Sequence, residues 1–144
     1  MTTHEASAAD QAAVAVMTQK MLAAWAHGDA SAIADLFTDD GTLILPGIFR
    51  QGRQDIKAYF TDAFATTYAG TQVVGKPISL RFFGPDTALL LSSGGVLSEG
   101  ETEVSDEQAI RAGWFAVRTD GQWRLAAYQN STAKTGLPNP GTGA

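Results

Sequence analysis

Apolar residues in the first half of the chain recur with the period of an α-helix. Residues 8–27, "AADQAAVAVMTQKMLAAWAH", carry an apolar residue at every third or fourth position, and so do residues 30–37 and 53–69. The three apolar stripes consist of Val14, Met17, Met21, Leu22 and Trp25, then Ile33, Leu36 and Phe37, then Ile56, Phe60, Ala63, Phe64 and Thr67. The pattern predicts three N-terminal helices, the second capped by Asp29.

The second half of the chain changes to the pattern of β-strands. Four segments, "TQVVGKPISLRFFG", "DTALLLSSGGVLS", "EQAIRAGWFAVR" and "GQWRLAAYQNST", are separated by turn signals such as "TDG" at 119–121. A short apolar strand, "TLILP" at 42–46, follows the turn residues "TDDG" at 38–41. Helices followed by a long meander predict an α+β fold, with three helices on one face of a strongly curved, mostly antiparallel sheet.

The length of 144 residues fits a single domain with a core of its own. We expect this domain to span residues 9–133. Residues 1–8 are expected to form a flexible N-terminus, and the Gly- and Pro-rich residues 134–144 a flexible tail.

Composition excludes several classes of function. The chain has no cysteine, which rules out disulfides and thiolate chemistry, and its net charge of −5 argues against nucleic-acid binding. No apolar stretch approaches the ~20 residues that span a membrane, and the N-terminus does not resemble a signal peptide. We therefore expect a cytoplasmic protein that binds neither membranes nor nucleic acids.

The last predicted hairpin has two different faces. A two-residue turn at Asp120–Gly121 pairs Thr119 with Gln122, and the same register continued along the strands places Trp114 opposite Ala127. The more apolar face, which should meet the helices, carries Trp114, Ala116, Trp123 and Leu125 and ends in Gln129.

The opposite face of this hairpin carries Phe115 and Tyr128, with Arg111 opposite Asn130. Exposed apolar groups on a sheet often mark an interface, so we expect a homodimer packed through Arg111, Phe115, Tyr128 and Asn130. The alternative is a pair of scattered surface aromatics.

Three motifs in order resemble a known family. They are "AAWAHGDASAIADLFTDDGTLILPG", "RQGRQDIKAYF" and "RTDGQWRLAAYQNST", within residues 10–132. Together they resemble the SnoaL-like, or nuclear transport factor 2-like, superfamily, and within it the SgcJ/EcaC family of enediyne and polyketide gene clusters. The resemblance implies a cone-like fold, also called cystatin-like, with an apolar pocket for a hydrophobic, polyketide-like small molecule, and dimerisation through the outer sheet face.

Two catalytic patterns of this superfamily are missing. Ketosteroid isomerases have a catalytic aspartate where this chain has Leu45, and scytalone dehydratases need a histidine pair in the pocket. The two histidines here are His4, near the N-terminus, and His27, at a helix end. The catalytic residues are therefore unknown, and any reaction would be a cofactor-independent isomerisation, cyclisation or dehydration.

The candidate ligand-binding residues are aromatic, with one amide. Gln129 can donate and accept a hydrogen bond but is no acid or base. Each candidate has an alternative reading as plain core. The set is Trp25, Phe49, Tyr59, Phe60, Phe64, Trp114 and Gln129.

Polar groups elsewhere give weaker signals. Asp39 and Asp40 are read as turn formers, Arg50 as a solvated cation, and His27 as a helix-end residue. The five acids of residues 98–107 lack the spacing of a calcium loop, and no other metal pattern or dinucleotide motif is present. We expect no metal and no cofactor.

The function that the sequence favours is an accessory pocket protein of enediyne or polyketide biosynthesis, which binds or acts on a polyene-type intermediate. Two alternatives remain open: a non-catalytic carrier with the same pocket, and a protein-interaction module that uses the outer face of the sheet.

Overall fold

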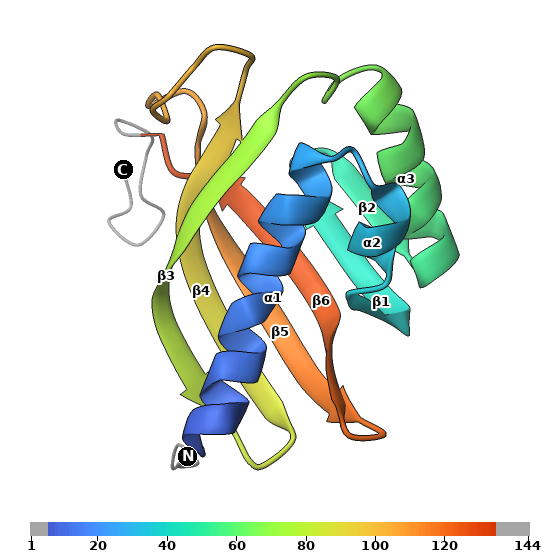
Figure 1. Cartoon of the computed structure of the whole chain (residues 1–144), viewed down its shortest axis with the longest axis vertical. Coiled ribbons are helices and arrows are strands. Elements are labelled where there is room, and N and C mark those ends of the chain that lie inside the picture. Colours follow the sequence, from blue (N-terminus) through green and yellow to red (C-terminus); the bar gives the residue numbers. More distant parts are fainter. Residues whose placement is uncertain (1–5, 135–144) are drawn as a thin grey trace, which may run out of the picture.

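The computed structural model describes residues 6–134, in which three helices cover one face of a six-stranded sheet (Figure 1). The longest helix lies lengthwise across the sheet, and the two shorter helices cover the end where β1 and β2 lie. The elements are α1 (Ala8–Ala26), α2 (Ala30–Ala34), β1 (Phe37–Leu45), β2 (Ile48–Gln51), α3 (Arg53–Ala65), β3 (Gln72–Phe82), β4 (Thr87–Leu97), β5 (Ala109–Thr119) and β6 (Gln122–Thr132). The α+β class with a curved, mostly antiparallel sheet is confirmed.

The helices begin and end where local chemistry satisfies their free backbone groups. Ser7 caps α1 by accepting from the Asp10 amide at 3.1 Å, and Asp29 caps α2 by accepting from the Ala32 amide at 3.0 Å. Between the two helices, Gly28 has a φ of +61°, which a side-chain-bearing residue rarely adopts. The chain can therefore turn from α1 into α2 within three residues.

Helix α3 ends four residues earlier than the sequence pattern predicts. The Tyr68 amide bonds back to the Ala63 carbonyl at 2.7 Å, which closes the helix in a turn. This turn directs the Tyr68 ring inward against Trp25, with the ring centroids 4.6 Å apart. A tertiary aromatic contact thus ends a helix that periodicity alone continues to residue 69.

The expected turn at 38–41 is wrong, because these residues belong to β1. Phe37 starts the strand and is fully buried, and the Leu125 amide of β6 donates to the Leu36 carbonyl just before it, at 2.7 Å. Asp39 leans outward and forms an ion pair with Arg53 at 2.8 Å. Phe37 and Thr42, on either side of this stretch, pair with β6 with a register shift between them, and this long-range pairing keeps the stretch within the strand.

The strand order is β2-β1-β6-β5-β4-β3, with β1 parallel to β6 and all other neighbours antiparallel. The register of β3 against β4 shifts between Pro77 and Ser79, which bends this long hairpin next to a proline. Of the expected flexible segments, 1–8 and 134–144, all but residues 6–8 and 134 lie outside the described part of the chain.

The register expected for the β5–β6 hairpin is right near the turn and wrong beyond it. Thr119 pairs with Gln122 and Ala116 with Leu125, but Phe115 then pairs with Ala127, so that Ala126 is left over as a bulge. One extra residue exchanges the two faces of the rest of the strand. Tyr128 and Asn130 therefore face the helices, and Gln129 faces outward.

The end of the sheet near the β5–β6 turn is closed by an arginine. Arg118 bonds to Asp10 of α1 at 2.7 Å, to Asp86 at 2.9 Å and to the Pro85 carbonyl at 2.7 Å. Its guanidinium also lies over the Trp123 ring, 5.1 Å from the centroid.

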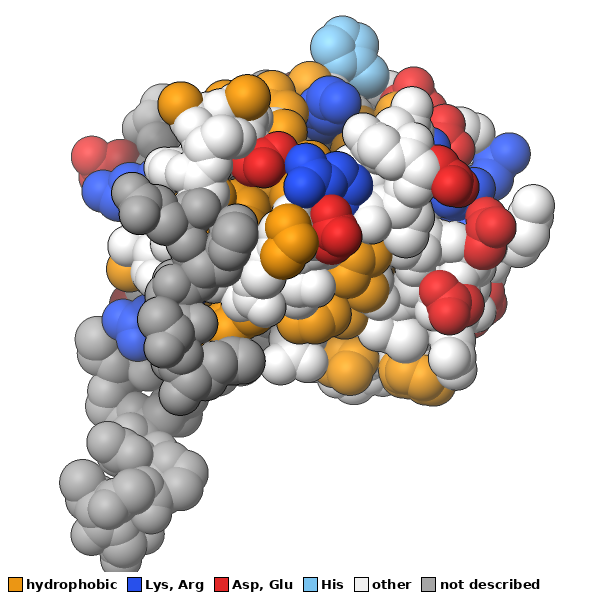
Figure 2. Space-filling view, turned by 90° about the horizontal axis from the view of Figure 1, so that it is seen from below, with side chains coloured by type: hydrophobic (Ala, Val, Ile, Leu, Met, Phe, Trp, Pro, Cys, Tyr) orange, Lys and Arg blue, Asp and Glu red, His pale blue; other side chains and the backbone are white. Residues whose placement is uncertain are grey.

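Figure 2, which views the molecule from below, shows basic and acidic side chains interspersed with hydrophobic ones rather than one block of a single charge.

Candidate functional site

The inner face of the sheet presents two rows of side chains to the helices. One row runs across the strands as Leu90, Trp114, Tyr128 and Leu43, and the next as Ser92, Ala112 and Asn130. The second row is made of small or polar side chains, so it cannot fill the space under α1 as the first row does. A cavity of about 140 Å³ remains between this part of the sheet and the helices.

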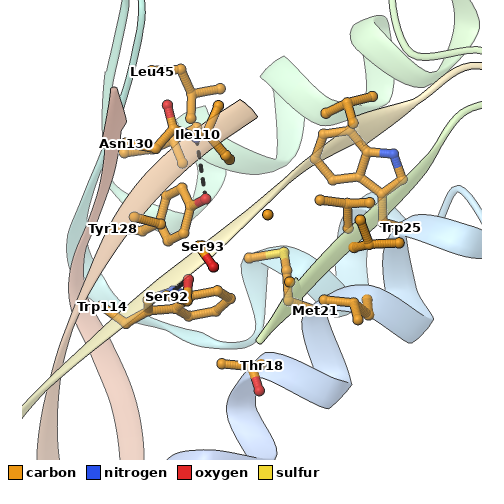
Figure 3. Close-up of a pocket in the computed structure, with 18 of the residues that line it drawn as sticks. Thr18, Met21, Trp25, Leu45, Ser92, Ser93, Ile110, Trp114, Tyr128 and Asn130 are labelled. Carbon is orange, nitrogen blue, oxygen red and sulfur yellow. Dashed lines mark hydrogen bonds between the residues drawn. The ribbon is translucent and has the colours of Figure 1, made fainter. Parts of the chain in front are cut away.

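Aromatic rings form the walls of this cavity (Figure 3). Trp25 of α1 packs edge-to-face on Phe60, with centroids 5.7 Å apart, and its indole nitrogen donates to Thr71 at 3.0 Å. On the sheet side, Trp114 and Tyr128 pack nearly perpendicular with centroids 4.8 Å apart. These packed rings give the cavity apolar walls on both the helix side and the sheet side.

Only a few polar groups reach the cavity, and most are already held by a neighbour. The Trp114 indole nitrogen donates to the Ser92 hydroxyl at 2.9 Å, and the Asn130 amide nitrogen donates to the Tyr128 hydroxyl at 3.2 Å. In Figure 3 the Tyr128 hydroxyl points toward the middle of the space. The Asn130 amide oxygen is buried without a hydrogen-bond partner.

The electrostatics of the cavity are those of a neutral site. Burial raises the pKa of the Tyr128 hydroxyl, and the hydrogen bond from Asn130 only partly offsets that effect. Burial and the hydrogen bond with Tyr59 likewise raise the pKa of Tyr68, which also lines the cavity. Among the residues described as lining the cavity there is no Asp, Glu, His, Lys or Arg. Both tyrosines thus stay protonated at neutral pH.

The structure brings three of the seven candidate ligand-binding residues to this cavity: Trp25, Phe60 and Trp114 line it. Phe64 and Tyr59 lie behind the wall, where Phe64 packs on Trp25 with centroids 5.4 Å apart and Tyr59 bonds to Tyr68.

The other two candidates, Phe49 and Gln129, are exposed on the outer face of the sheet. For Gln129 the reason is the bulge at Ala126, and for Phe49 it is the pairing of β2 with β1, which puts Phe49 beside the outward-facing Ile44.

Sequence reasoning missed the polar lining of the cavity, which comes from Thr18, Tyr68, Ser92, Ser93, Tyr128 and Asn130. Ser92 carried a signal, since it breaks the inward-facing series Ala88, Leu90 of its strand. For Tyr128 and Asn130 the only signal was the Ala126–Ala127 pair, where small side chains permit a bulge without requiring one. Leu45, which stands where ketosteroid isomerases have their aspartate, does line the cavity.

The remaining polar candidates have structural partners. Arg50 lies over the Tyr59 ring, 5.3 Å from its centroid, and the His27 ring bonds to the Ala23 carbonyl at 2.8 Å. Asp40 accepts from the Thr38 hydroxyl at 3.0 Å, and His4 lies outside the described residues. Within residues 6–134, no group of three acidic or histidine side chains could hold a metal ion. No helix in that range has the length and apolarity needed to cross a bilayer.

Three solved structures show how widely this architecture occurs. A cystatin-like domain of unknown function from Nostoc punctiforme superposes with a TM-score of 0.83 at 26% identity, covering 94% of this chain and 83% of that one. A nuclear transport factor 2-like protein from Novosphingobium aromaticivorans gives 0.76 at 20% identity, covering 90% and 85%. A ketosteroid isomerase-like protein from Erwinia carotovora atroseptica gives 0.71 at 19% identity, covering 88% and 98%.

At identities this low, the last two similarities concern the fold alone. No curated protein matches the sequence. A family model does match, and it covers residues 6–129, which contain all of the described helices and most of the sheet. The chain therefore belongs to the SnoaL-like domain family and has a cystatin-like fold.

Proposed function

We propose that this protein binds a neutral, largely apolar small molecule in the cavity between α1 and the sheet. The observation that carries the proposal is the cavity itself: about 140 Å³ of space, walled by aromatic rings, with no charged side chain among its described lining. Ligand sites are typically apolar enclosures with a few placed polar groups. A well-packed core has few voids larger than a water, so a space of this size is a feature to explain.

The volume sets the scale of the ligand. An apolar cavity of ~150 Å³ in another protein binds benzene. This cavity thus has room for about one aromatic ring or a comparable stretch of polyene chain. Its lining also reaches the surface, because Pro46 is exposed and Val74 and Ile110 are only half-buried. A longer ligand would place one segment inside and the rest through this opening.

The similarity of the three sequence motifs to the SgcJ/EcaC family suggests the biological setting. We assign the protein, as a hypothesis, to enediyne or related polyketide biosynthesis in the cytoplasm, where it would hold or act on a polyene-type intermediate. The lack of an acid or base in the described lining favours binding and shielding over proton-transfer catalysis. Neutral hydrogen-bond donors can assist an isomerisation or cyclisation, so we retain the enzyme hypothesis together with the carrier hypothesis.

Tryptophan fluorescence tests the binding proposal, since Trp25 and Trp114 both face the cavity. Titration with α-methylstyrene, a one-ring hydrocarbon, should give a saturable change and raise the melting temperature, because a ligand that binds only the folded state stabilises it. No saturable change and no thermal shift would refute the proposal. The biosynthetic setting has a separate test: native mass spectrometry of protein from its natural host should find a bound polyene, and a clean apo mass would count against that setting.

We also propose a homodimer through the outer face of the sheet. Large exposed hydrophobic side chains gather there: Phe49 is 57% and Phe115 40% exposed, and Ile44 and Leu91 share the same face. Gln129 lies between Ile44 and Gly113 in one cross-strand row of this face. Arg111 stays on it as expected, whereas Tyr128 and Asn130 do not.

Light scattering during size-exclusion chromatography tests the dimer. The unmodified chain should elute at twice its own mass, and Phe115→Glu should yield a monomer that still binds α-methylstyrene. If the unmodified chain is a monomer at micromolar concentration, the dimer proposal is contradicted, and the proposal of ligand binding in the cavity is unaffected.

A further inference from the structure

We propose that the cavity selects ligands that carry a carbonyl oxygen, and that the Tyr128 hydroxyl donates the selecting hydrogen bond. This inference rests on the proposed function, since it names the chemical class of ligand for the same cavity. It follows from the direction of each hydrogen bond at the cavity wall rather than from which residues line it.

The first step concerns the proton of Tyr128. Its hydroxyl oxygen accepts from the Asn130 amide nitrogen at 3.2 Å, so that side of the oxygen is occupied by a donor. A phenol hydrogen lies near the plane of the ring and has two positions, one on either side of the C–O axis. Asn130 occupies one side of this oxygen, and the hydroxyl points toward the space in Figure 3, so its proton is left to be donated to a ligand there.

Ser92 is arranged in the same way on the other side of Trp114. Its hydroxyl oxygen accepts from the Trp114 indole nitrogen at 2.9 Å, and the indole has no acceptor to offer in return. No described residue accepts the Ser92 proton. Each of the two hydroxyl oxygens therefore accepts a hydrogen bond from an N–H group and keeps its own proton to donate. The cavity wall thus offers a hydrogen-bond donor at both positions.

The surroundings decide which ligand can use these protons. No described cation lines the cavity, so a carboxylate or phosphate would lose its hydration without gaining a countercharge. An ammonium ion would meet no described carboxylate. A neutral carbonyl oxygen only accepts, so it can take the proton of Tyr128 and leaves no donor of its own unpaired. Because burial raises the pKa of Tyr128, the donor persists throughout the neutral range.

Three one-ring probes isolate this contact. Acetophenone and α-methylstyrene have nearly the same shape and differ in C=O against C=CH₂, while 1-phenylethanol replaces the ketone with an alcohol. By tryptophan fluorescence, acetophenone should bind about three- to tenfold more tightly than α-methylstyrene, which is the usual net worth of one neutral hydrogen bond. The infrared C=O stretch of bound acetophenone should lie at lower frequency than in an alkane solvent.

Tyr128→Phe should abolish the preference for acetophenone over α-methylstyrene and move the C=O stretch of bound acetophenone back toward its alkane value. Ser92→Ala, the second variant, should lower the preference less than Tyr128→Phe does, because Tyr128 can still donate. Tyr59→Phe is the matched control, because it removes a phenol hydroxyl that bonds to Tyr68 behind the cavity wall, and the protein should keep its preference for acetophenone over α-methylstyrene.

The relative affinities of the three probes decide between acceptor and donor ligands. Equal binding of acetophenone and α-methylstyrene would overturn the inference while leaving the proposed binding function intact. Tighter binding of 1-phenylethanol than of acetophenone would also overturn it, because the buried Asn130 oxygen would then select the ligand by accepting. If none of the three probes binds, the proposed function fails and the inference with it.

Discussion

Filling the cavity should make the protein more stable and, at the same time, a poorer binder. Ala112 is the residue of choice, because it is buried on the inner face between Ser92 and Asn130 and lines the cavity. Ala112→Leu adds a branched group of three carbons. One water molecule takes up ~30 Å³ in the liquid, so 140 Å³ has room for about four or five groups of that size. A methyl or methine carbon is about as large as a water, so the three new carbons occupy roughly half of the cavity or more.

The magnitude follows from burial. Three added carbons at ~0.8 kcal/mol each contribute about 2.4 kcal/mol, and the lost rotamer freedom of leucine costs about 0.5–1 kcal/mol. The Asn130 oxygen is already buried without a partner, so covering it adds no new penalty there. The expected net gain in the free energy of unfolding is about 1–2 kcal/mol, which corresponds to a rise in melting temperature of roughly 3–6 °C.

Two assays on the same sample measure both effects. Urea denaturation should show a higher midpoint with an unchanged slope, and affinity for α-methylstyrene should fall by more than about tenfold because the ligand must now displace side-chain atoms. If the space is in fact filled, the same substitution overpacks the core and destabilises it by about 1–3 kcal/mol. The sign of the stability change alone therefore separates an open cavity from a filled one, and a destabilised variant would rule out the open cavity.

Three further predictions concern the same framework. Binding of acetophenone should not vary between pH 6 and 9 by isothermal titration, since the cavity is lined by no described acid, base or histidine; a titrating step in that range would contradict the neutral site. Folded-state pKa values of Tyr68 and Tyr128 lie above the ordinary value of about 10, so their contribution to stability is complete below that pH and is lost as pH rises beyond it. Melting temperature should therefore decline above pH 10, and less steeply in Tyr128→Phe. Gly41→Ala should destabilise the fold by about 1–3 kcal/mol in urea, because its new Cβ would lie 3.0 Å from the Phe37 ring and 3.1 Å from the Leu125 carbonyl oxygen; a neutral effect would show that β1 can shift away from β6.

The periodicity of the sequence is sufficient to predict the helices and strands whose buried face is set by residues close together in the chain. The apolar stripe of α1 faces the sheet and buries Met21 and Trp25, because helical spacing alone determines which side of the helix is apolar. The same holds for the four long strands and for the β5–β6 turn, where Asp120 and Gly121 both adopt positive φ. These features depend on residues close together in the chain.

The polar half of the site could not be predicted in this way. A bulge at Ala126 reverses the faces on which Tyr128, Gln129 and Asn130 lie, and an alanine at this position does not predict a bulge. The stretch at 38–41 has turn residues but lies within β1, because Phe37 and Thr42 on either side of it pair with β6 from the far end of the chain. Both errors arise from long-range pairing, which is set by the sheet as a whole rather than by local propensity.

A crystal structure of the chain soaked with acetophenone would show directly whether the cavity is open and which group in its wall holds the ligand. We expect density for one ring between Trp25 and Trp114, with the carbonyl oxygen within hydrogen-bond distance of the Tyr128 hydroxyl. A core in which side chains close the space, with the ketone absent or bound only on the surface, would contradict both the binding function and the selection of carbonyl ligands.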